Sequence, residues 1–111
     1  MPTITGASGA YPHNLNNGSI FYHTSIGGNF TANFTNVPTD NDRKISVALV
    51  LVQGGTPYIA NLVQIDNNPV TIKWVNGQVP TGSASNVNIE SFTLIRTGSA
   101  WTVLGSMSTF S

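Results

Sequence analysis

Two histidines, His13 and His23, are the residues of this 111-residue chain best suited to acid–base chemistry near neutral pH. They lie ten residues apart, His13 in a polar segment and His23 at the end of an apolar run. A histidine that acts as a general base needs a nucleophile and an orienting partner, and the sequence indicates neither. Cysteine is absent, and no serine lies in a nucleophile-elbow context. We therefore expect structural roles for both histidines.

The carboxylates suggest two further sites, a cation site and a glycosidase pair. The segment DNDR at 40–43 resembles the start of a calcium loop, but it lacks the spaced ligands and the final bidentate glutamate. Asp66 and Glu90 could form a pair of glycosidase carboxylates, yet each lies at the end of a predicted strand and nothing pairs them. The sequence thus predicts a protein that is not an enzyme, with no catalytic residue, no metal site and no cofactor.

Charge is scarce in this chain. It has four basic and four acidic residues, and these make up only 7% of the sequence against about 25% in a typical globular protein. No basic stripe favours nucleic acid, and the apolar run at 45–52 is far shorter than a membrane span. The first residues do not form a signal peptide. A net charge of zero favours association with other proteins.

The elements that position these residues are predicted to be strands. Alternation is clearest at 29–35, where Phe30, Ala32 and Phe34 share one face. The predicted strands cover 19–23, 29–35, 44–53, 58–66, 69–75, 87–96 and 100–110. The expected fold is therefore all-β, an antiparallel β-sandwich of about seven strands formed by residues 18–111, with a jelly roll as a variant.

Local patterns refine three of these strands. From Val47 onward, residues 44–53 are apolar at both odd and even positions, so both faces of the strand would be apolar. This predicts a central strand that is covered on both faces or buried in a subunit contact. In 87–96 the apolar residues change from odd to even positions near Glu90 and Ser91, which predicts a β-bulge. Tight hairpin turns are expected at Asn67-Asn68 and at 97–99.

Contacts with a partner are expected from segments outside the predicted strands or at their margins. Residues 1–17 are interpreted as a flexible N-terminal arm that is ordered on docking, with Tyr11, Pro12 and His13 in the contact. Tyr58 follows the GGTP turn and is a further candidate. Trp74 lies on an apolar strand face, where core packing is the simpler interpretation.

Three stretches carry a family resemblance: NFTANFTNVPTDNDRKISVALVLVQGGTPYIANLVQID at 29–66, TIKWVNGQVPTG at 71–82 and ESFTLIRTGSAWTVLG at 90–105. Together they resemble a β-rich domain of virion structural proteins from marine tailed phages, especially cyanophages. Such domains occur in capsid-decorating and tail-fibre-like proteins. The resemblance covers roughly residues 18–111 and implies no active-site residue. The chain has no coiled coil or long shaft, which favours a small component over a whole fibre.

The resemblance implies a decoration protein on the surface of the phage particle. It would attach to the major capsid protein or to another virion protein as a homo-oligomer, a trimer being one option, without binding nucleic acid or entering a membrane. The alternative is a tail or fibre-tip module that recognises a host cell-surface glycan through the loop 76–86 with Tyr58 or Trp74. A glycan-cleaving enzyme is disfavoured, because no acid and base can be named.

Overall fold

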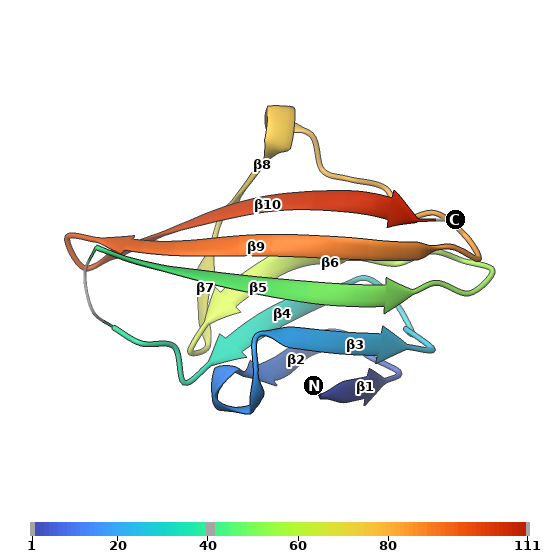
Figure 1. The fold of residues 1–111 in the computed structure, drawn as a ribbon, viewed down its shortest axis with the longest axis horizontal. Helices are drawn as coiled ribbons and strands as arrows, with labels where there is room; N and C mark the ends of the chain where they lie inside the picture. Colours follow the sequence, from blue (N-terminus) through green and yellow to red (C-terminus); the bar gives the residue numbers. More distant parts are fainter. Residues whose placement is uncertain (1, 40–41, 111) are drawn as a thin grey trace.

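The computed structural model describes residues 2–39 and 42–110, and these form ten strands in two stacked sheets (Figure 1). Two short 3₁₀ segments, η1 (Leu15–Asn17) and η2 (Val75–Gly77), are the only helical turns in this part of the chain. The all-β prediction is confirmed. The strands are β1 (Thr3–Thr5), β2 (Gly9–Asn14), β3 (Ile20–Thr24), β4 (Phe30–Thr35), β5 (Arg43–Val52), β6 (Ala60–Ile65), β7 (Asn68–Val70), β8 (Ile72–Trp74), β9 (Val87–Thr97) and β10 (Ala100–Phe110).

From β1 to β6 the chain passes from one sheet to the other at each connection. The six-stranded sheet has the order β1-β3-β5-β9-β10-β8, and the four-stranded sheet has the order β2-β4-β6-β7. Strands two apart in the chain thus become neighbours and run in the same direction, so their pairing is parallel. Among the described strands, β5–β9, β9–β10 and β6–β7 are antiparallel. Both sheets are mixed, and the prediction of an antiparallel sandwich or jelly roll is wrong.

The chain crosses between the sheets at both sides of the stack. On one side β1 and β2 are edge strands of different sheets, and on the other side β7 and β8 are. The predicted strand 69–75 is therefore two strands, which separate at Thr71. Residues 3–5 and 9–14, which the sequence analysis assigned to a flexible arm, form β1 and β2. These additional strands explain why there are ten in place of the predicted seven.

The hairpin turns use residues that tolerate a positive φ. Asp66 and Asn67 have φ of 47° and 71°, so the turn lies one residue before the predicted Asn67-Asn68. Gly98 and Ser99 have φ of 54° and 65°, which matches the turn expected at 97–99. Positive φ at both central residues gives the twist that joins neighbouring antiparallel strands.

No bulge occurs in β9, whose pairing with β5 and β10 keeps one register throughout. Asn88 and Glu90 point inward with Phe92 and Leu94, and all four are buried. The prediction of a bulge is wrong because the inward residues Asn88 and Glu90 are polar. The apolar residues therefore change from outward to inward positions along the strand, although the strand itself stays regular. Residues 44–53 form the central part of the six-stranded sheet, with β5 between β3 and β9.

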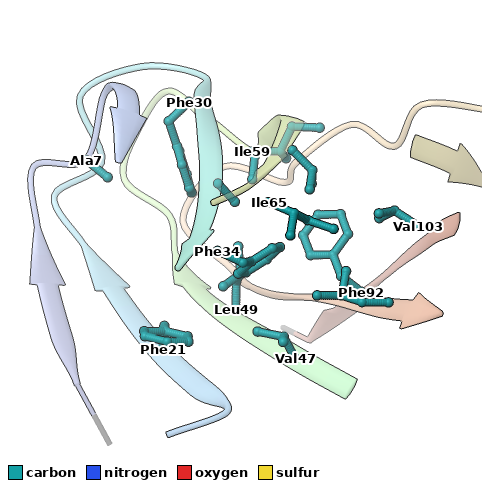
Figure 2. Close-up of a cluster of buried hydrophobic side chains, with 14 of the residues drawn as sticks. Ala7, Phe21, Phe30, Phe34, Val47, Leu49, Ile59, Ile65, Phe92 and Val103 are labelled. Carbon is teal, nitrogen blue, oxygen red and sulfur yellow. The ribbon is translucent and has the colours of Figure 1, made fainter. Parts of the chain in front are cut away.

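The core lies between the two sheets and is rich in phenylalanine (Figure 2). Phe30, Ala32 and Phe34 all face it, as their alternation predicted. Phe34 on β4 meets Phe92 on β9 edge to face, with ring centroids 5.8 Å apart, and so joins the two sheets. Burial of one such ring contributes about 1.5–3 kcal/mol.

Candidate functional site

His13 and His23 meet inside the core. His13 comes from β2 and His23 from β3, and neither side chain has exposed surface. Their Nε2 atoms are 3.0 Å apart, and His13 Nδ1 lies 2.8 Å from the Tyr11 carbonyl. Phe21 and Phe30 pack around the pair, at ring-centroid distances of 4.9 Å from His13 and His23 respectively.

These contacts fix where the protons are. The Tyr11 carbonyl can only accept, so His13 donates from Nδ1 and accepts at Nε2 from the Nε2–H of His23. His23 Nδ1 is then an unprotonated, buried acceptor without a partner. Burial lowers the pKa of both imidazoles from 6.5 to about 4; the Tyr11 carbonyl opposes this change at His13, and repulsion from His13 adds to it at His23. The pair is neutral and enclosed in the core, without exposed surface.

Acid should destabilise the protein through this pair. The unfolded chain protonates its histidines near pH 6.5 and the folded chain only near pH 4, so the stability that they contribute is lost as the pH falls through this window. His23→Gln keeps an amide that can donate to His13 Nε2, and we expect it to remove about half of the loss. Urea unfolding between about pH 7 and pH 4 measures this. An equal loss in both proteins would contradict the assignment.

The other residues predicted from the sequence do not form one site. Pro12 is exposed, Tyr11 and Tyr58 are half-buried, and Tyr11 packs edge-on against His13. Of the DNDR segment, Asp40 and Asn41 lie outside the described residues. Within residues 2–39 and 42–110, no three histidine, aspartate or glutamate side chains gather as metal ligands.

Asp66 and Glu90 lie in different environments, one exposed in a turn and the other inside the core. Asp66 is exposed in a hairpin turn, where its Oδ1 accepts from the Asn36 N–H at 2.9 Å. Glu90 is fully buried on β9; its Oε1 accepts from the Ala60 N–H at 3.0 Å, and its Oε2 has no partner. Burial raises the pKa of Glu90 to about 8, although the Ala60 N–H opposes the change. Glu90 is therefore protonated at neutral pH and holds β6 against β9.

A network of amide side chains orders the loops beside Glu90. The fully buried Asn88 donates to Thr109 Oγ1 at 2.9 Å, and its Oδ1 accepts from Gln53 Nε2 at 3.0 Å and from the Ser83 N–H at 3.1 Å. Gln53 also bonds both the N–H and the carbonyl of Tyr58, at 3.0 and 2.7 Å. Asn88 and Gln53 thereby fix the loops around Tyr58 and Ser83. This explains why inward positions of β9 are polar.

A groove of about 520 Å³ lies where the chain leaves the four-stranded sheet for the six-stranded sheet. It is lined by residues of β6, β7 and β8, by Thr31 of β4, by Thr71 between β7 and β8, and by Val79 of the loop that follows η2. A smaller hollow of about 200 Å³ continues it and shares Asn61 and Val79. Trp74 lines the groove, whereas Tyr58 lines neither hollow. Hereafter "the groove" means the larger hollow.

Trp74 is held in place by a glycine on the neighbouring strand. β8 pairs with β10 so that Trp74 lies beside Gly105, where a Cβ atom would be 2.8 Å from the indole Cε3 and Cζ3 atoms. Phe92 supports the ring from the core, with centroids 5.9 Å apart. Trp74 is thus partly core, as the sequence indicated, and partly a wall of the groove.

Four uncharged polar side chains also line the groove: Thr31, Asn61, Gln64 and Thr71. Within the described residues, none of them makes a side-chain hydrogen bond, and neither does the Trp74 indole N–H. Of the charged residues within 2–39 and 42–110, none lines either hollow. The sequence indicated Trp74 and the loop 76–86, which contains Val79, as an alternative glycan site. It did not reveal the polar lining, because Thr31 comes from β4 and Asn61 and Gln64 from β6, which are far apart in the sequence.

The outward side of the six-stranded sheet, the outer face, combines apolar side chains with serines and threonines and carries little charge. Val50 lies between Tyr22 and Ile89 in the sheet, and Val52 pairs with Val87. Ile20 is 46% exposed and Phe110 is 53% exposed at the margins of this face. At the described outward positions of β3, β5, β8, β9 and β10, Lys44 and Lys73 are the charged residues. A shallow hollow of about 360 Å³ lies over Ala48 and Ser91.

Comparison of the chain with protein-family models, with curated proteins and with solved structures finds no match. No helix in the described part of the chain is long and apolar enough to cross a membrane. The groove and the outer face are the two surfaces of the described chain that suit contact with a ligand or a partner.

Proposed function

We propose that this protein is a non-enzymatic structural protein of a phage virion, and that it decorates the head by attaching to the major capsid lattice. The observation that carries the proposal is the outer face. A sheet surface with exposed aliphatic and aromatic side chains and little charge is well suited to burial against another protein. The family resemblance of residues 18–111 supplies the virion context.

The size of the outer face is adequate for such a contact. The spacing between strands and the rise per residue give the outer face an area of roughly 600 Å². A standard interface buries about 800 Å² on each partner. The hollow over Ala48 and Ser91 is lined by serine and threonine side chains together with Ile20, and it can receive a protruding side chain of a partner. The partner is the major capsid protein or a second virion protein, and copies of this chain associate as a homo-oligomer on the particle surface.

Gold-labelled antibody against this chain, viewed on intact virions by electron microscopy, tests the proposed location. Label distributed over the head supports decoration. Label confined to the tail would overturn it and would favour the alternative, a module at the tail or fibre tip.

Charge on the outer face should abolish attachment. Val50→Lys and Ile20→Lys each place an ammonium group where the interface would be desolvated, and we expect each to weaken capsid binding at least about tenfold. Leu62→Lys is the matched control, because Leu62 is 60% exposed on the other sheet. Co-sedimentation with capsids that lack the protein measures binding, after circular dichroism has verified folding. Undiminished binding of both outer-face variants would contradict the proposal.

A further inference from the structure

We infer that the groove beside Trp74 binds an uncharged saccharide. The inference concerns a different surface from the outer face. It rests on the proposed function only in one respect, namely that the groove faces away from the particle when the outer face is docked.

The first step is the chemistry of the lining. Asn61 and Gln64 each offer an amide donor and an amide acceptor, and Thr31 and Thr71 each offer a hydroxyl, all without a partner among the described residues. A sugar hydroxyl both donates and accepts, so neighbouring hydroxyls complement such side chains. A wholly apolar ligand would remove these groups from water without replacing their hydrogen bonds.

The second step is the Trp74 indole. Gly105 and Phe92 hold it from behind, so its position at the groove is fixed before any ligand arrives. The C–H face of a pyranose can pack on such a ring, and an amphipathic side chain with few rotatable bonds makes this contact at low entropic cost. Val79 and Leu62 add apolar surface around it.

The third step is charge and size. Among the residues that the structure describes, no acidic or basic side chain lines the groove, so a charged ligand would be desolvated there without a counter-charge. Lys73 lies between two groove residues in sequence, but it aligns with Leu104, whereas Ile72 and Trp74 align with the buried Val103 and Gly105. Lys73 therefore belongs to the outer face. The volume of about 520 Å³ is in the range of sites for small ligands.

The same alignment places the groove opposite the outer face. Ile72 and Trp74 point from β8 toward the four-stranded sheet, and Thr31 and Gln64 lie on the strands of that sheet. A copy docked through the outer face would thus present the groove to the surrounding medium. Such a protein could attach the particle to a polysaccharide without occupying its docking surface.

The test is a titration of the ¹⁵N-labelled full chain, followed by NMR, with the methyl glycosides of glucose, galactose, mannose and N-acetylglucosamine. We expect at least one glycoside to cause saturable shifts of the Trp74 indole N–H and the Asn61 and Gln64 side-chain amides. Gln64→Ala and Asn61→Ala should each weaken that binding about tenfold. Gln78→Ala, an exposed glutamine outside both hollows, should leave it unchanged.

Three results would overturn the inference. They are the absence of saturable shifts with all four glycosides, equal affinity of wild type and Gln64→Ala, and tighter binding of benzyl alcohol than of any sugar, which would identify an apolar site. Failure here is distinguishable from failure of the proposed function. Val50→Lys should retain the sugar-dependent shifts while losing capsid binding, and Gln64→Ala should show the reverse.

Discussion

Replacing Glu90 with glutamine is expected to raise stability by several kcal/mol at about pH 9 while leaving it nearly unchanged at about pH 4.5. The glutamine carbonyl can accept from the Ala60 N–H as Glu90 Oε1 does. Its amide nitrogen occupies the place of Oε2, which has no partner in the wild type. The variant therefore resembles the protonated glutamate in shape and cannot ionise.

The direction follows from the two states of the chain. Burial raises the pKa of Glu90 from 4.5 to about 8 in the folded protein, so the folded chain binds a proton that the unfolded chain has released. Stability is lost as the pH rises through this window. Because the two buried histidines act in the opposite direction below pH 6.5, the wild type should be most stable near about pH 6.5.

Urea unfolding of both proteins across this pH range measures the effect. Asp66→Asn is the matched control, because it neutralises an exposed carboxylate and retains an acceptor for the Asn36 N–H. The control should follow the wild type at alkaline pH. If the stability of Glu90→Gln fell at alkaline pH as much as that of the wild type, Glu90 would not be the group that titrates on unfolding.

Local alternation predicted which residues face the core, and it did so well where the inward side chains are apolar. Phe30, Ala32 and Phe34 are buried as their spacing indicates, because successive residues of a strand point to opposite faces. The turn at Gly98-Ser99 was also predictable from residue type. These features depend on a few neighbouring residues.

The sheet to which each strand belongs could not be predicted in the same way. A strand such as β4 pairs with β2 and β6 and not with β3 or β5, because each connection crosses to the other sheet. Nothing in the alternation of Phe30 and Phe34 distinguishes a crossing from a hairpin. The assumption that consecutive strands pair therefore gave an antiparallel sandwich.

Buried polar residues were the second source of error. Asn88 and Glu90 were treated as outward because they are polar, and this produced a false bulge in β9. Their burial depends on partners far along the chain, such as Gln53 for Asn88 and Ala60 for Glu90. His13 was assigned to an exposed arm for the same reason, although its partner is His23 in the core.

The groove depends on one close contact, between Gly105 and Trp74, and replacement of this glycine should disturb both stability and ligand binding. In Gly105→Val, the new Cβ would lie 2.8 Å from the indole ring and 2.9 Å from Ile72 Cγ2. Valine is favoured over glycine in a strand. If space were available, the substitution would therefore stabilise the protein by up to about 1 kcal/mol. Overpacking costs about 1–3 kcal/mol and reverses the sign.

We expect Gly105→Val to unfold at a lower urea concentration than the wild type and to shift the NMR signal of the Trp74 indole N–H. Because β8 must move away from β10 to make room, the groove loses its fixed wall, and the glycoside-dependent shifts should disappear. Ser106→Val is the control on the same strand, since it adds a similar side chain at a half-buried position next to Gly105. It should retain the wild-type indole signal. Wild-type stability and an unchanged indole signal in Gly105→Val would show that Trp74 does not depend on this contact, and the preformed groove would lose its structural basis.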